Sequence, residues 1–223
     1  MTEEVESRFL AHPDKGEVSS LLLVPKGAKW LLVLGHGAST DMRHKNLQMI
    51  AESLAAVGIA TFRYNHPYLE RGGGRDARVV TLATVRAACE AAHQSAPKLQ
   101  LLAGGHSFSG RMTSGAAAAA PLPHVQGIVF FSFPLHPAGK PAIERAEHLD
   151  DVTVPMLFLS GTRDALAELE LLEPVVQKYD EATLHLIDTA DHGFKTLKRT
   201  RQSAEDVYAE MARILVDWTT RLA

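Results

Sequence analysis

Short, uninterrupted hydrophobic runs alternate along the chain with longer stretches in which hydrophobic residues recur every three or four positions. The runs are typical of strands buried on both faces, and the spaced stretches are typical of amphipathic helices. Strands are predicted at residues 30–34, 59–63, 99–103, 127–131, 154–159 and 183–187. Helices are predicted at residues 47–57, 78–94, 166–179 and 204–222, with a further, alanine-rich helix ending near residue 119. This alternation predicts an α/β fold, with a mostly parallel central sheet and helices on both faces.

The two remaining regions are the N-terminus and one long connection. Residues 5–24 contain two short apolar stretches separated by HPDKG, which predicts an antiparallel hairpin at an edge of the sheet. The connection between residues 133 and 154 holds at most a short helical turn, at 143–148, so it is too short for a substantial lid domain. We expect one domain spanning residues 1–223, with an open site.

Composition narrows the function classes. A formal net charge of −3 with mixed signs argues against nucleic acid as a partner. The acidic N-terminus lacks the pattern of a signal peptide, and no hydrophobic run is long enough to span a membrane. The single cysteine, Cys89, precludes an internal disulfide and fits a reducing compartment. We therefore expect a cytoplasmic location and no membrane partner; the oligomeric state stays open.

The residues around position 107 carry the clearest chemical signal. A buried strand leads through Gly104 and Gly105 to Ser107 and then directly into the alanine-rich helix. Such a sharp turn needs small neighbours and projects the serine above the sheet edge, as in the G-x-S-x-G nucleophile motif. Here the motif reads GHSFS, with Ser109 in place of the last glycine. Ser107 is the predicted nucleophile; Ser109, its rival, lacks a glycine two residues upstream.

Two further strand ends supply the partners that a serine nucleophile needs. Asp164 follows the strand 154–159, and His192 follows the strand 183–187. Histidine can accept the serine proton near neutral pH, and a carboxylate can orient the imidazole. The carboxyl ends of parallel strands meet at one edge of the sheet, so Ser107, Asp164 and His192 are predicted to form a catalytic triad.

Alternative roles remain for several of these residues. Asp164 could simply cap the following helix. His185, His36 and His106 are the rivals of His192 as the base, although His185 lies within a strand and His36 is better placed to shape a loop. The eleven histidines show no metal-binding spacing, so we expect no metal and no cofactor.

Six motifs spread over nearly the whole chain carry a family resemblance. They are LGHGASTDMRH (34–44), FRYNHPY (62–68), GGHSFSGR (104–111), HPAGKP (136–141), SGTRD (160–164) and ADHGFK (190–195). With these motifs the chain resembles the α/β-hydrolase superfamily, close to its dienelactone-hydrolase-like branch. The resemblance implies the lidless α/β-hydrolase fold, the Ser107–Asp164–His192 triad, and the backbone N–H groups of Ala38 and Phe108 as oxyanion donors.

The chain departs from the family pattern at two positions where glycine is usual, Ser39 and Ser109. We expect both hydroxymethyl groups to lie near the oxyanion hole and to alter its geometry. The function expected is a serine hydrolase of the carboxylesterase or dienelactone-hydrolase-like type, acting on a small acyl substrate. The alternatives are a thioesterase or peptidase using the same site, and an interaction module with a vestigial triad.

Overall fold

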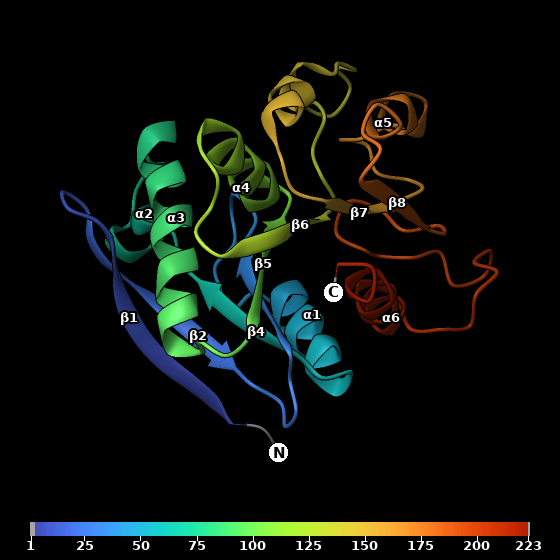
Figure 1. Ribbon diagram of the computed structural model, residues 1–223. Coiled ribbons are helices and arrows are strands. Elements are labelled where there is room, and N and C mark those ends of the chain that lie inside the picture. Colours follow the sequence, from blue (N-terminus) through green and yellow to red (C-terminus); the bar gives the residue numbers. More distant parts are fainter. Residues whose placement is uncertain (1–2, 223) are drawn as a thin grey trace.

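Eight strands form one sheet in the computed structural model, which describes residues 3–222 (Figure 1). The strands are β1 (Glu4–His12), β2 (Gly16–Leu23), β3 (Trp30–Gly35), β4 (Ile59–Tyr64), β5 (Gln100–His106), β6 (Val125–Phe131), β7 (Met156–Gly161) and β8 (Ala182–Ile187). Their order across the sheet is β1-β2-β4-β3-β5-β6-β7-β8. Strand β2 pairs antiparallel with β1 and β4, and all pairings from β4 to β8 are parallel. The predicted edge hairpin and the mostly parallel sheet are confirmed.

Helices cover both faces of the sheet, as predicted (Figure 1). They are α1 (Lys45–Ala56), α2 (Pro67–Arg71), α3 (Arg78–Ser95), α4 (Phe108–Ala119), the 3₁₀ helix η1 (Glu144–Asp151), α5 (Leu169–Val176) and α6 (Val207–Thr219). The helices α3, α4, η1 and α5 pack on one face, and α1 and α6 pack on the other.

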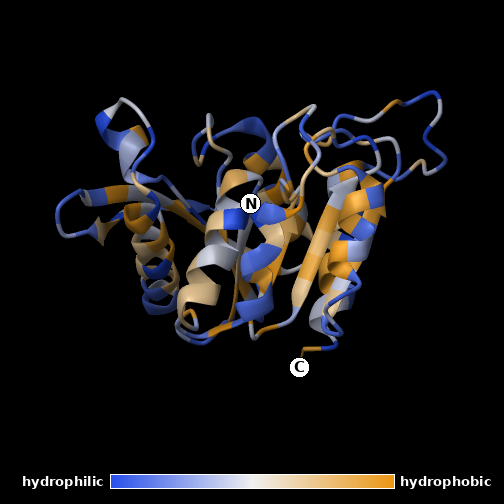
Figure 2. Cartoon of the chain, turned by 90° about the horizontal axis from the view of Figure 1, so that it is seen from above, coloured by the Kyte–Doolittle hydropathy of each residue, from blue (hydrophilic) through white to orange (hydrophobic). Residues whose placement is uncertain are grey.

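The central strands face a hydrophobic layer on each side. In β3, Leu31 and Val33 join the core under α3 and α4, while Leu32 and Leu34 join the core under α1 and α6. Because successive side chains of a strand point to opposite faces, a strand covered on both sides must be hydrophobic throughout. Figure 2 shows this arrangement, with hydrophobic residues concentrated along the strands and inner helix faces.

The structure differs from the sequence-based expectation at three helices. The Asp206 side chain accepts hydrogen bonds from the N–H groups of Tyr208 and Ala209, so α6 begins at Val207 and not at residue 204. Helix α5 is likewise shorter than the predicted range 166–179. The short helix α2 was not predicted; it begins at Pro67, whose ring suits the first helical position.

The connection between β6 and β7 contains η1 and no other helix or strand within the described residues. The prediction of no substantial lid domain is therefore confirmed. None of the helices within residues 3–222 is both long enough and hydrophobic enough to cross a membrane.

Close backbone packing at Gly104 generates a prediction about stability. A Cβ atom at Gly104 in β5 would lie 2.0 Å from the Val129 carbonyl oxygen of β6, so the Gly104→Ala variant must separate these two strands. We expect it to lower the free energy of unfolding by about 3 kcal/mol or more, as measured by urea denaturation. The control is Gly74→Ala, where nothing lies within 4 Å and the change should stay within about 0.5 kcal/mol. Equal stability of the two variants would contradict this account.

Candidate active site

Four loops meet at the carboxyl edge of the sheet. Ser107 follows β5, Asp164 follows β7 and His192 follows β8, while Ala38 lies in the loop after β3. In the sheet, β3 lies next to β5 and β7 lies next to β8. The spacing of the strands along the sequence does not by itself show which strands are adjacent. The edge therefore collects residues that are far apart along the chain.

The backbone of Ser107 is held in an unusual conformation. Its φ of 51° and ψ of −108° lie outside the regions that non-glycine residues commonly adopt. This geometry lets α4 start directly after β5 while packing closely on the sheet. A Cβ atom at Gly105 would lie 2.7 Å from the Gly35 carbonyl oxygen, and one at Gly110 would lie 2.8 Å from the Gly105 carbonyl oxygen. The Ser107 N–H donates to the Phe131 carbonyl at 2.9 Å, which fixes the turn to β6.

A chain of hydrogen bonds connects the three polar side chains. His192 Nε2 lies 2.8 Å from Ser107 Oγ, and His192 Nδ1 lies 2.8 and 2.9 Å from the two carboxylate oxygens of Asp164. With Nδ1–H as the donor to the carboxylate oxygens, Nε2 is left to accept a hydrogen bond from the Ser107 hydroxyl. This arrangement can remove the serine proton as the hydroxyl attacks an electrophile.

Burial differs along this hydrogen-bonded chain. The Asp164 side chain is fully buried, whereas the His192 side chain is 22% exposed. Asp164 Oδ1 also accepts from the Leu166 N–H at 2.8 Å, so it orients the local turn as well as the imidazole. The alternative that Asp164 caps the following helix is wrong, because α5 begins only at Leu169.

The two proposed oxyanion donors have free amide groups. Within residues 3–222, no protein acceptor is found for the N–H of Ala38 or for that of Phe108, the first residue of α4. The Ala38 loop packs against the turn at Ser107, because a Cβ atom at Gly37 would lie 3.1 Å from His106 Nδ1. The Tyr68 hydroxyl donates to the Ala38 carbonyl at 2.9 Å and so fixes this loop from α2.

Ser109 lies beneath the loop that carries Ala38. Its side chain is fully buried beneath the Ala38 loop: Oγ donates to the His36 carbonyl at 2.5 Å and accepts from His66 Nε2–H at 3.0 Å. The Ser109 hydroxymethyl group thus lies against the loop that carries Ala38, and its hydroxyl is inaccessible as a nucleophile. Ser39, by contrast, is exposed.

The histidines that rival His192 have structural contacts. His36 Nδ1–H donates to the Gly37 carbonyl at 2.7 Å, while its Nε2 accepts from the His66 N–H at 3.2 Å. Burial lowers the pKa of His36 to about 4 and lowers the pKa of His66 well below its usual value, so both rings are neutral at pH 7. His66 lies in the motif FRYNHPY, but its contact with Ser109 depends on the tertiary fold and has no local signal in the sequence.

His106 contacts the loop that carries His192. Its Nε2–H donates to the His192 carbonyl at 3.0 Å, and burial lowers the pKa of His106 to about 4. The neutral ring therefore fixes the backbone of the loop that carries His192.

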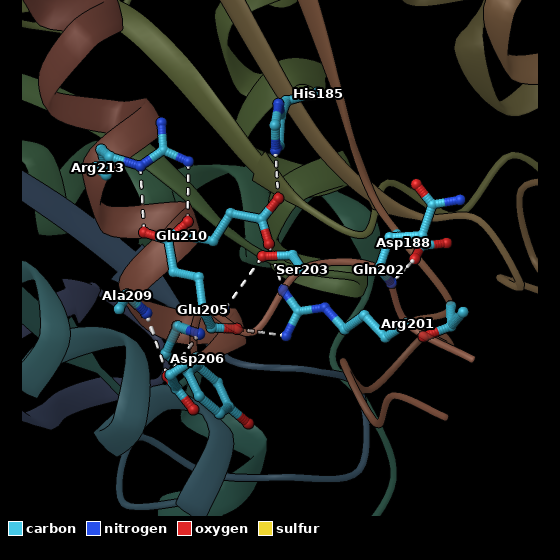
Figure 3. Close-up of polar contacts among 12 residues, drawn as sticks. His185, Asp188, Arg201, Gln202, Ser203, Glu205, Asp206, Ala209, Glu210 and Arg213 are labelled. Carbon is cyan, nitrogen blue, oxygen red and sulfur yellow. Dashed lines mark hydrogen bonds and ion pairs between the residues drawn. The ribbon is translucent and has the colours of Figure 1, made fainter. Parts of the chain in front are cut away.

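A buried ionic network anchors the far end of that same loop. Glu210 of α6 accepts hydrogen bonds from His185 in β8, at 2.8 Å, and from Arg201 in the β8–α6 connection (Figure 3). Arg201 Nη1 also donates to the Glu205 carbonyl at 2.6 Å. The ring of His185 is thus hydrogen-bonded to Glu210. A cavity of about 350 Å³ lies here, lined by residues 196, 198, 201 and 203–207, which include neither Ser107 nor His192.

A metal site is not evident in the described chain. Among residues 3–222, no three His, Cys, Asp or Glu side chains are grouped closely enough to hold a metal ion. Cys89 is fully buried, and burial raises the pKa of its thiol to about 12.

Comparison with known proteins identifies the fold. The family profile described as "Alpha/beta hydrolase domain" matches residues 28–220. Dienelactone hydrolase from Anabaena variabilis is similar in structure, with a TM-score of 0.77, 18% identity and coverage of 99% of this chain and 98% of that one. XC6422 from Xanthomonas campestris, described as an α/β serine hydrolase without lid, has a TM-score of 0.71, 20% identity and coverage of 99% and 95%. Est1E from Butyrivibrio proteoclasticus has a TM-score of 0.71, 16% identity and coverage of 96% and 99%.

The buried network of Figure 3 generates a prediction about stability. Replacing Glu210 with Gln leaves the Arg201 side chain, only 7% exposed, without its counter-charge. We expect Glu210→Gln to lower the free energy of unfolding by about 3 kcal/mol, as measured by chemical denaturation. The matched control is Arg213→Gln, which removes a pair exposed by 50% and 33% and should cost about 1 kcal/mol or less. A Glu210 variant as stable as the control would show that the network contributes little.

Proposed function

This chain belongs to the α/β-hydrolase family, and we propose on that basis that it is a serine hydrolase that cleaves an ester or a related acyl substrate. One observation supports this most strongly: the continuous hydrogen-bonded sequence from the Ser107 hydroxyl through His192 to the buried Asp164 carboxylate. The three residues lie on three separate loops, and chance packing would rarely align their side chains in this order.

In the proposed acylation step, Ser107 Oγ attacks the acyl carbonyl carbon while its proton moves to His192 Nε2. Asp164 stabilises the imidazolium that forms. The carbonyl oxygen becomes an oxyanion, for which the free N–H groups of Ala38 and Phe108 are the proposed donors. The intermediate then expels the leaving group, which takes the proton from His192, and Ser107 retains the acyl group.

In the proposed deacylation step, water takes the place of the serine hydroxyl. His192 removes a proton from the water, the resulting hydroxide attacks the acyl carbonyl, and Ser107 leaves with that proton. The partial exposure of His192 allows water to reach the acyl group. The steps balance with water as the only co-reactant, so the proposed reaction needs no metal and no cofactor.

Covalent labelling tests the proposed nucleophile. We expect a fluorophosphonate probe to label the wild-type chain and the control variant Ser95→Ala, which alters an exposed serine at the end of α3. The variant Ser107→Ala should remain unlabelled. We also expect His192→Ala and Asp164→Asn to lower kcat for a short p-nitrophenyl ester by about 10⁴-fold. Labelling of folded Ser107→Ala would refute the assignment, and a folded, unlabelled wild type would favour a non-catalytic interaction module.

The contacts of Ser109 generate a second kinetic prediction. Ser109→Ala removes the hydroxyl that holds the His36 carbonyl and leaves His66 Nε2–H unpaired, so the Ala38 loop is held less firmly. If Ala38 serves the oxyanion, we expect kcat to fall about tenfold with KM changed by less than about twofold.

The control for Ser109 is Thr84→Ala in α3. It also removes a buried hydroxyl, but one that donates only to its own helix, at the Val80 carbonyl. This variant should lose stability without the change in kcat. An unchanged kcat in Ser109→Ala would mean that the contact is structural only.

A further inference from the structure

Arg111 of α4 lies near three arginines from other segments, Arg75, Arg78 and Arg145. Arg111 lies one helical turn after Ser107 and donates its backbone N–H to the Ser107 carbonyl at 3.2 Å. Arg75 precedes α3, Arg78 begins α3, and Arg145 lies in η1. Figure 1 shows α4 flanked by α3 on one side and by the gold-coloured η1 on the other.

The contacts of α4 place the side chains of Arg75 and Arg78 along the face that carries Arg111. The guanidinium carbon of Arg75 lies 5.7 Å from the centre of the Phe108 ring. Arg78 Nη2 lies 2.6 Å from the position of a Cβ atom at Gly115. Positions 108, 111 and 115 are spaced by three and four residues, so they share a face of α4 that begins at the nucleophile. The absence of a side chain at Gly115 leaves room for the Arg78 guanidinium.

None of the four guanidinium groups is neutralised within the described chain. No carboxylate lies within ion-pair distance of Arg75, Arg78, Arg111 or Arg145 in residues 3–222, and none of the four side chains donates a hydrogen bond to a protein acceptor there. The Nε of Arg111 is buried without a partner. The Nε of Arg201 is also buried without a partner, but that guanidinium group is paired with Glu210.

The arginines reinforce one another's positive potential. Burial lowers the pKa of Arg111, and so do the charges of Arg145, Arg78 and Arg75. Burial and the charges of Arg78 and Arg111 lower the pKa of His148 to about 4 despite Asp151, so the ring is neutral at pH 7; its Nε2 lies 2.7 Å from Ser114 Oγ.

The ends of the helices add to this potential. Neither α3 nor α4 has an acidic residue in its first turn or a side-chain N-cap. Cations at the positive end of a helix dipole are unfavourable, so Arg78 and Arg111 stand where they oppose helix stability. The fold holds these two cations in unfavourable positions, and no carboxylate within the described chain compensates for them. Residues that lower stability in this way are typical of functional sites.

We propose that the acyl substrate of this site carries an anionic group, a carboxylate or a phosphate, which the guanidinium groups of Arg111, Arg78, Arg75 and Arg145 bind between α3, α4 and η1. This proposal rests on the proposed hydrolase function, because Ser107 supplies the reacting atom. Guanidinium groups bind carboxylate and phosphate oxygens through charge-assisted, often paired, hydrogen bonds. A bound anion offsets the repulsion among the four charges.

A matched pair of esters tests the proposal in turnover. The p-nitrophenyl monoester of glutarate and p-nitrophenyl pentanoate have acyl chains of equal length and differ in the terminal carboxylate. We expect the wild type to have a higher kcat/KM for the glutarate ester, and the ratio of the two values to fall about 10- to 100-fold in Arg111→Gln. Arg78→Gln, at an exposed position, provides a second variant if Arg111→Gln does not fold.

The control is Arg221→Gln, an exposed arginine after α6, which should leave the ratio unchanged. The 4-phosphonobutanoate ester distinguishes a phosphate-type group from a carboxylate. A wild type that prefers the pentanoate ester to both anionic esters, or a ratio unaffected by Arg111→Gln and Arg78→Gln, would overturn the proposal.

A binding measurement separates this proposal from the proposed reaction. Calorimetric titration of Ser107→Ala with monomethyl glutarate and with phenyl phosphate needs no turnover. We expect one of the two anions to bind, and its affinity to fall about tenfold or more when Arg111→Gln is added. Absence of binding by either anion, or binding unaffected by the second substitution, overturns the anion site. Failure of the proposed hydrolase function would appear separately, as absent fluorophosphonate labelling and no hydrolysis of either ester.

Discussion

The close approach of α4 to the edge of β3 and β5 is the constraint on which the rest of the site depends. Gly35, Gly105 and Gly110 leave no room for a Cβ atom between the strands and the helix. The chain can therefore pass from β5 into α4 only through the unusual backbone of Ser107, which projects its side chain above the sheet edge. The roles proposed for His192 and Asp164 depend on this serine being held there.

The loops around the serine are held by neutral polar contacts in a dry interior. His36, His66 and His106 are buried without charge, and each donates a ring N–H to a carbonyl or hydroxyl oxygen. A neutral imidazole supplies one donor and one acceptor at low desolvation cost, which suits these buried positions. Ser109 connects two of these histidine contacts and so belongs to the support of the site, not to its reactive surface.

Much of this arrangement could be predicted from the sequence, because the strands and the turn at Ser107 are encoded locally. Hydrophobic runs identify the buried strands, and the small residues around Ser107 identify the turn. Contacts between distant segments have no such local signal. The Ser109–His66 bond joins α4 to the end of β4, and the four arginines meet only because η1 and α3 flank α4. The start of α6 was missed because the Asp206 cap lies inside a stretch with helical spacing.

The charges around the two ends of α4 differ in how well they match the helix dipole. This difference affects which ligands the site can bind. At the C-terminal end, Arg86 donates to the carbonyls of Ala116 and Pro121 at 2.6 and 2.9 Å, so the negative end of the dipole meets a cation. At the N-terminal end, positive charge accumulates without an acidic partner in the described chain. Core packing of Met112 and Ala116 holds the helix in place despite that repulsion. The fold thus maintains a positive potential beside Ser107, and an anionic substrate is the chemical class that this potential attracts.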